Sequence, residues 1–149
     1  MEPWDFALAE GAVVEELDTK ARRQLMQRWR ETFAVPVRER TGRWVYGGIE
    51  WHAFSWGFCQ SRSGKRALAD YFAEAIESLL VLPQDEGSPA FRCTTANHID
   101  FTPCHEDVYI VPDSFDWTIA FTHEEGVGPF FSRPEWCDGL AVKSSRDDD

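Results

Sequence analysis

Cysteine and histidine side chains gather between residues 93 and 105, and their types could bind a metal. Cys93, His98, Cys104 and His105 offer thiol and imidazole groups, which are the ligands that zinc prefers. Their spacing, Cys-x4-His-x5-Cys-His, lacks the two short ligand pairs of structural zinc sites. The neighbouring side chains of Cys104 and His105 tend to diverge, and Cys93 falls in an apolar segment where buried thiols are common. The pattern favours core cysteines and loop histidines over a metal site, and we expect no cofactor.

A second group with chemical potential is His123, Glu124 and Glu125, within the stretch DVYIVPDSFDWTIAFTHEEGVGPFF of residues 107–131. A histidine beside a carboxylate can act as a general base. The metalloprotease signature H-E-x-x-H is absent, and so is the G-x-S-x-G of a nucleophilic serine. The alternative is a structural role, in which the histidine lies at the rim of a sheet and is hydrogen-bonded to a loop carbonyl or a carboxylate. A small hydrolase or metal-dependent enzyme remains the alternative function, with the candidate residues His98, Cys104, His105, His123 and Glu124.

Composition limits the classes of partner. The 149 residues fit one domain, and 15 basic against 26 acidic residues give a net charge of −11. This excess of acid disfavours nucleic acids and anionic membranes, whereas it would attract a basic protein. No apolar run approaches the ~20 residues that span a bilayer, and the acidic start lacks the positive region of a signal peptide. We therefore expect a cytoplasmic protein whose four cysteines are free thiols.

Two helices must position these groups. A helix is predicted from near Glu15, capped by Asp18 or Thr19, because apolar residues then recur every fourth position as far as Phe33. Pro36 is expected to stop this helix, and residues 34–48 to connect it onward. A second helix is predicted from the serines at 61 and 63 to about residue 80, closed by Pro83. We expect residues 1–14 to form an irregular or short extended lead-in.

Strands are predicted at about 90–95, 107–112 and 116–123, with Asp113-Ser114 as a tight turn between the last two. Residues 49–58 read as a short buried strand or turn. Trp117, Ile119 and Phe121 alternate along 116–123, which indicates one buried face. The expected fold is α+β: a single domain with two main helices packed on one face of an antiparallel sheet, ending in a frayed acidic tail at 143–149.

The stretch 107–131, with WHAFSWGFC and WRETFA upstream, resembles a bacterial family of small proteins, domain-of-unknown-function family four-two-seven-five. The likeness covers about residues 23–131, and the hairpin is its specific part. The resemblance brings no catalytic residues. We interpret the matching positions as a structural motif that anchors the hairpin and holds the bend after it: Trp51, Trp117, Thr122, His123, Gly128, Pro129 and Phe130.

These features favour a binding protein over an enzyme. Small acidic proteins of this sort are similar to the immunity partners of bacterial toxins, by an analogy of size and charge. The expected partner is therefore a basic protein, such as a toxin domain, which the acidic surface would steer into contact. The candidate contacts are acids on faces expected to be exposed: Glu74, Glu77, Asp85, Glu86, Glu124 and Glu125.

Overall fold

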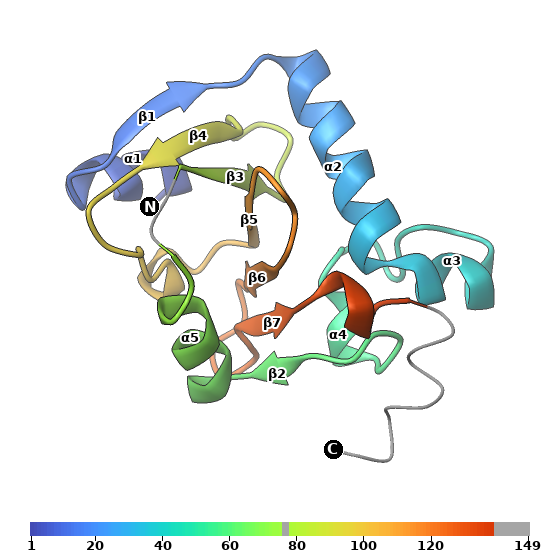
Figure 1. Ribbon diagram of the computed structural model, residues 1–149. Coiled ribbons are helices and arrows are strands. Elements are labelled where there is room, and N and C mark those ends of the chain that lie inside the picture. The colour runs from blue at the N-terminus through green and yellow to red at the C-terminus, as the bar shows by residue number, and fades with distance from the viewer. Residues whose placement is uncertain (76–77, 139–149) are drawn as a thin grey trace.

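Seven antiparallel strands form one sheet at the centre of the protein (Figure 1). The computed structural model describes residues 1–75 and 78–138. The strand order is β1-β4-β3-β5-β6-β7-β2. The strands are β1 (Val13–Glu16), β2 (Arg62–Ser63), β3 (Leu79–Pro83), β4 (Phe91–Thr94), β5 (Val108–Pro112), β6 (Thr118–Phe121) and β7 (Phe130–Ser132). This arrangement confirms the predicted α+β class with an antiparallel sheet.

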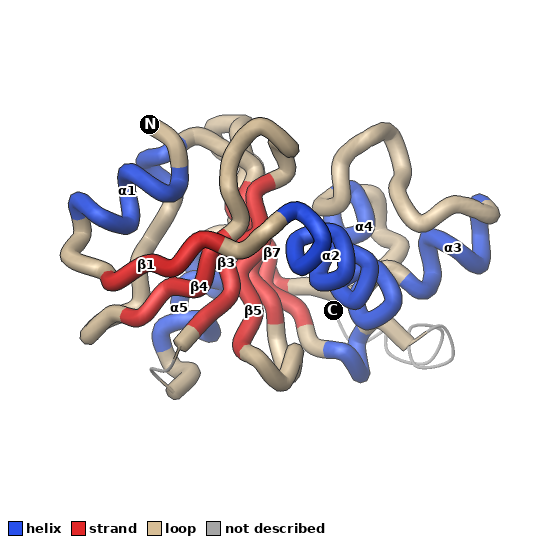
Figure 2. Tube along the Cα trace, turned by 90° about the horizontal axis from the view of Figure 1, so that it is seen from above, coloured by secondary structure: helices blue, strands red, loops and turns tan. Residues whose placement is uncertain are grey.

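Helices lie on both faces of this sheet. They are α1 (Pro3–Ala9), α2 (Thr19–Phe33), α3 (Val35–Thr41), α4 (His52–Ser55) and α5 (Lys65–Phe72), with two 3-10 turns, η1 (Thr102–Cys104) and η2 (Pro134–Trp136). Figures 1 and 2 place α2 and α5 on opposite sides of the strands. The core divides accordingly: Tyr109 and Val111 of β5 pack with Trp29 of α2, whereas Val108 and Ile110 pack with Tyr71 of α5. We had expected the two main helices to pack on one face of the sheet, but they pack on opposite faces.

The predicted second helix is the largest correction. Helix α5 ends at Phe72, and residues 79–83 form strand β3 between β4 and β5. All five residues of β3 are buried, because α2 covers one face and α5 the other. A run such as Leu-Leu-Val-Leu is typical of a strand buried on both faces, and over so few residues it also fits a helical stripe.

Several segments in the first 58 residues differ from expectation. Residues 1–14 hold helix α1 and the first residues of β1 rather than only an irregular or short extended lead-in. Helix α2 begins at Thr19, and the predicted cap at Asp18 is confirmed, because its carboxylate accepts from the Ala21 N–H at 2.7 Å. Pro36 lies in the first turn of α3, where its missing N–H costs nothing. Residues 52–55 of the predicted 49–58 strand or turn form helix α4.

The predicted hairpin is confirmed: β5 and β6 pair antiparallel, with Val108 opposite Phe121. We had expected one buried face on β6, but both faces are buried, because Thr118 and Ala120 are as buried as Ile119. The Thr118 hydroxyl meets the need for hydrogen bonds there. It accepts from Trp29 Nε1 at 2.9 Å and donates to the Ile110 carbonyl at 3.0 Å. The acidic tail at 143–149 lies outside the described residues.

Candidate functional site

A buried tyrosine ties the loop before α4 to the end of β3. The Tyr109 hydroxyl donates to Gln84 Oε1 at 2.6 Å and accepts from the Trp51 N–H at 3.0 Å. Gln84 Oε1 also accepts from the Glu50 N–H at 3.2 Å. Complete burial raises the pKa of Tyr109 well above its usual value of 10, and the nearby Glu50 and Asp107 raise it further. The phenol is therefore a neutral hydrogen-bonding group that fixes residues 50–51.

Asp107 forms a second tie at the same end of the sheet, just before β5. Its carboxylate accepts from Trp51 Nε1 at 2.8 Å, from the His123 N–H at 2.8 Å and from His123 Nδ1 at 2.9 Å. The bond to Asp107 raises the pKa of His123 above 6.5, against a smaller opposing effect of burial. The His123 side chain is 46% exposed, and its Nε2 has no hydrogen-bond partner among residues 1–75 and 78–138. An imidazole held this way could exchange a proton with a bound molecule.

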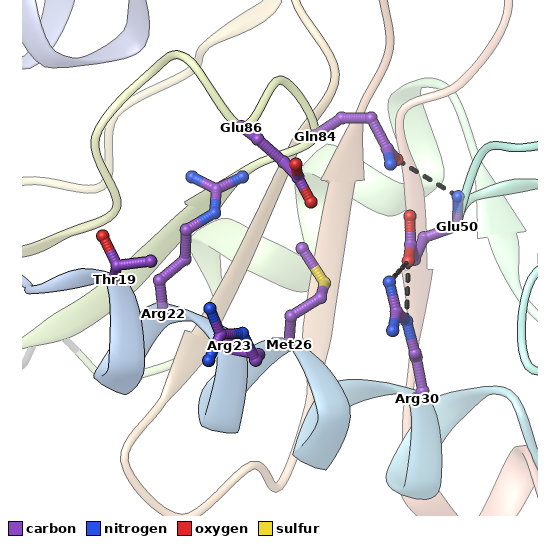
Figure 3. Close-up of a pocket in the computed structure, with 8 residues that line it drawn as sticks. All are labelled: Thr19, Arg22, Arg23, Met26, Arg30, Glu50, Gln84 and Glu86. Carbon is purple, nitrogen blue, oxygen red and sulfur yellow. Dashed lines mark hydrogen bonds and ion pairs between the residues drawn. The ribbon is translucent and has the colours of Figure 1, made fainter.

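Beside this network, α2 forms one wall of a pocket of about 320 Å³ (Figure 3). The helix contributes five side chains, and the loop before α4 and the end of β3 contribute three from the opposite side. The lining residues are Thr19, Arg22, Arg23, Met26, Arg30, Glu50, Gln84 and Glu86. The pocket therefore joins three guanidinium groups and two carboxylates over the buried side chain of Met26.

Glu50 is the most unusual group in this pocket, because it is only 2% exposed. Its Oε1 accepts from Arg30 Nε at 2.8 Å and lies 2.6 Å from Arg30 Nη2. Its Oε2 is buried without a hydrogen-bond partner among the described residues. Arg22 is also engaged, because it donates to the carbonyls of Ser88, at 2.7 Å, and Pro83. Burial lowers the pKa of Arg22, and the nearby Glu86 opposes that shift.

An aromatic surface, defined as Tyr46, His52 and Trp56, lies around α4. Trp56 is 61% exposed and its ring centroid is 5.5 Å from that of Tyr46. The His52 ring lies 6.4 Å from Tyr46 and 6.2 Å from Trp56, and its Nδ1 contacts the Tyr46 carbonyl at 2.7 Å. Gly47 permits this approach, since it has φ +65° and a Cβ there would lie 2.7 Å from His52 Nδ1.

The acids predicted to contact a partner do not form one surface. Glu86 lines the pocket beside α2, whereas Glu124 and Glu125 line a hollow of about 60 Å³ at the turn before β7. Glu74 pairs with Arg133 at 2.8 Å. Asp85 accepts from the Gly87 N–H at 2.9 Å, and Glu77 lies outside the described residues.

The cysteines and histidines of residues 93–105 are dispersed. Cys93 and Cys104 are buried, which raises the pKa of each thiol to about 11. Partial burial lowers the pKa of His98, whose ring lies 4.8 Å from that of Tyr71, whereas His105 lines the hollow at the turn before β7. Within the described ranges, no three His, Cys, Asp or Glu side chains are arranged to hold a metal ion.

The residues of the predicted structural motif surround the β6–β7 turn. The Thr122 hydroxyl donates to the carbonyls of Val127 and Glu124, and the Gly128–Pro129 bond is cis. Phe130 stacks on Trp51 at 5.9 Å between ring centroids, and Phe131 stacks on Trp117 at the same distance. Both tryptophans are buried.

Comparison with known families identifies the chain. Residues 10–131 match the family described as a domain of unknown function, DUF4275. The protein belongs to DUF4275. Comparisons with curated proteins and with solved structures found no match. In the part of this DUF4275 protein that the structure describes, no helix has the length and apolar character needed to cross a membrane.

Sequence reasoning missed the polar residues at the centre of this DUF4275 site. Glu50, Gln84 and Arg30 were not singled out, and Asp107 was noted only as part of the family resemblance. One local signal was present, because Glu50 stands between Ile49 and Trp51 in an aromatic segment, where a charge is expected to be buried and paired. Its partner Arg30 is 20 residues away on another element, which spacing alone does not reveal.

Proposed function

We propose that this protein is a cytoplasmic, acidic binding protein that neutralises a basic bacterial toxin domain by direct contact. The observation that carries the proposal is the aromatic surface, in which Trp56 is 61% exposed and Tyr46 38% exposed. Tryptophan and tyrosine are the side chains that most often dominate the energy of protein interfaces. A soluble protein keeps a tryptophan in water at a cost, which a partner that covers it would remove.

The aromatic surface is supported rigidly, which favours tight binding. His52 is fixed by the Tyr46 carbonyl, and its ring packs edge-on against the buried Trp51 at 4.9 Å. Trp51 is in turn held by Tyr109 and Asp107. A surface that is ordered before binding loses little conformational entropy on association, and this slows dissociation.

Charge supports a basic partner. The net charge of −11 would steer such a protein toward the chain, and it disfavours nucleic acids and anionic membranes as ligands. Glu124 and Glu106 lie close enough to His123 to raise its pKa, and the His123 ring is 6.2 Å from Trp51. These acids therefore lie near His123, at the Trp51 support of the aromatic surface. Closer to the aromatic surface, Arg40 lies over the ring of Phe58, which packs 5.2 Å from that of Tyr46, so the partner needs an acidic or neutral rim there.

The test compares wild type with Trp56→Ala and with Phe72→Ala, a matched control that removes another exposed aromatic, 48% exposed on α5. A partner captured from the source cells would be purified, and its affinity measured by titration calorimetry at low and physiological salt. We expect Trp56→Ala to weaken binding about 30-fold or more, since interface tryptophans contribute about 2 kcal/mol or more. Salt should weaken it further, and co-expression should restore growth to cells expressing the partner.

The proposal fails if no partner is captured at low salt, if Trp56→Ala binds as tightly as wild type, or if the partner is acidic. If the partner binds but co-expression does not restore growth, the protein is a binding protein and its partner is not a toxin. Each arm is scored with protein whose thermal unfolding shows that the variant is folded.

A hydrolase remains a second candidate because the Asp107 carboxylate orients His123 as it would a general base. The cysteine version has less support, since burial raises the pKa of the Cys93 and Cys104 thiols and so suppresses the nucleophilic thiolate. Hydrolysis of a panel of ester, amide and phosphate substrates should then fall on His123→Gln. Metal analysis of the purified protein tests the metal-dependent version, and turnover that His123→Gln leaves unchanged would remove the candidate.

A further inference from the structure

The pocket beside α2 contains a hydrogen-bond acceptor that the chain leaves unused. Glu50 Oε2 is buried and has no partner among the described residues, although Glu50 Oε1 bonds to Arg30. In Figure 3 the second oxygen points away from Arg30, toward the side of the pocket where Gln84 lies. Buried carboxylate oxygens are almost always hydrogen-bonded, because leaving one without a donor costs free energy. A donor from water, or from a ligand that reaches Glu50 Oε2, would remove this cost.

The opposite end of the pocket offers a cation. Arg23 is exposed, and its guanidinium has no hydrogen bond or ion pair with residues 1–75 or 78–138. Arg23 and Arg30 line the same pocket, and Arg30 lies seven residues after Arg23 on helix α2. Seven residues of α-helix rise about 10 Å, so the backbone positions of Arg23 and of Arg30, the partner of Glu50, are about two helical turns apart. Met26 lies between them and offers an apolar contact in the middle.

This layout excludes simpler ligands. An anion such as phosphate would pair with Arg23 but would leave Glu50 Oε2 without a donor. A simple amine would satisfy Glu50 but would leave Arg23 unpaired. A ligand that satisfies both ends carries a cationic N–H donor and a carboxylate, joined by an apolar chain.

We propose that the pocket binds a basic amino acid, with its side-chain ammonium or guanidinium on Glu50 Oε2 and its carboxylate on Arg23. The extended side chain of lysine or arginine, with one hydrogen bond at each end, fits the separation of the two groups. The methylene carbons of the ligand lie on Met26. This site is separate from the aromatic surface, and the proposal does not rest on the toxin-binding function.

The experiment is titration calorimetry of the full chain with L-arginine and L-lysine, and with two truncated probes. Agmatine is arginine without its carboxylate, and norleucine is lysine without its side-chain amine. We expect saturable binding of arginine or lysine and at least about tenfold weaker binding of the matching truncated probe, because each loses a charged hydrogen bond.

Variants assign the binding to this pocket. Arg23→Gln and Glu50→Gln should each weaken binding at least about tenfold. The control is Arg66→Gln, which makes the same charge change at an exposed position of α5, the helix on the opposite face of the sheet, and it should bind as wild type does. If Glu50→Gln fails to fold, the proposal is tested by Arg23→Gln and by the binding of the truncated probes to the wild-type protein. Absence of saturable binding by both amino acids overturns the proposal, as does equal binding by Arg23→Gln or by the truncated probes.

Discussion

The Tyr109 hydroxyl should contribute more to stability than the only other buried tyrosine hydroxyl in the described ranges. Tyr109 is fully buried, donates to Gln84 Oε1 and accepts from the Trp51 N–H. Tyr71 is 1% exposed and makes one bond, to the Ile99 carbonyl at 2.9 Å. Replacement by phenylalanine removes the hydroxyl and keeps the ring in both cases, so the pair isolates the hydrogen bonds.

The magnitudes follow from the number of bonds lost. Tyr71→Phe should cost about 1 kcal/mol, the usual net value of one neutral hydrogen bond. Tyr109→Phe should cost about 2–3 kcal/mol, because two bonds are lost and the buried Trp51 N–H is left without an acceptor. For a chain of this length that corresponds to a fall in Tm of about 5–10 °C.

Urea unfolding followed by tryptophan fluorescence measures both costs, with unchanged m-values as the check that the unfolding reaction is the same. A cost for Tyr109→Phe equal to or below that of Tyr71→Phe would refute the reasoning. It would mean that the hydroxyl does not join the loop at residues 50–51 to β3, and that Trp51 finds another acceptor.

Three further results are expected. His123→Gln should lower the free energy of unfolding most below pH 6.5, and this loss of stability should shrink as the pH rises through the raised pKa of His123. The reason is that His123 forms an ion pair with the Asp107 carboxylate only while its imidazole is protonated. Urea unfolding midpoints at several pH values measure the effect. Leu82→Ala should cost about 3 kcal/mol and Leu8→Ala, at a position 48% exposed, less than about 0.5 kcal/mol, in the same assay. The four buried cysteines should react with a thiol reagent only after urea is added, and rapid labelling of native protein would contradict their burial.

The parts of the fold that the sequence predicted are those specified locally. Helix α2 has its cap at Asp18 and an apolar stripe that repeats along 15 residues, so its signals all lie within the segment. The β5–β6 hairpin has a turn between two adjacent strands, and it too is a local unit. Strand β3 is different, because its neighbours in the sheet, β4 and β5, supply the hydrogen bonds that distinguish it from a helix.

The candidate site was less predictable for the same reason. Glu50 meets Arg30 across 20 residues, and Asp107 meets His123 across 16. Neither pair is marked by spacing, because Glu50 lies in a loop that packs against α2, and Asp107 and His123 flank paired strands whose separation depends on the turn between them. We expected His123 to bond to a loop carbonyl or a carboxylate at the rim of the sheet, and the structure shows that its partner is the carboxylate of Asp107.

Three consecutive residues connect the pocket with the aromatic surface. Glu50 lines the pocket, Trp51 is buried between Tyr109 and Asp107, and His52 belongs to the aromatic surface. Each side chain is fixed by hydrogen bonds to a different element, so the backbone of residues 50–52 has little freedom to move at one end alone. The backbone N–H groups of Glu50 and Trp51 are held by Gln84 and Tyr109, which bond to each other, so a shift of the backbone at Glu50 would also act on Trp51. The two surfaces therefore depend on one segment, and the polar network that holds it explains why charged and hydroxyl groups occupy sites where apolar side chains would pack at lower cost.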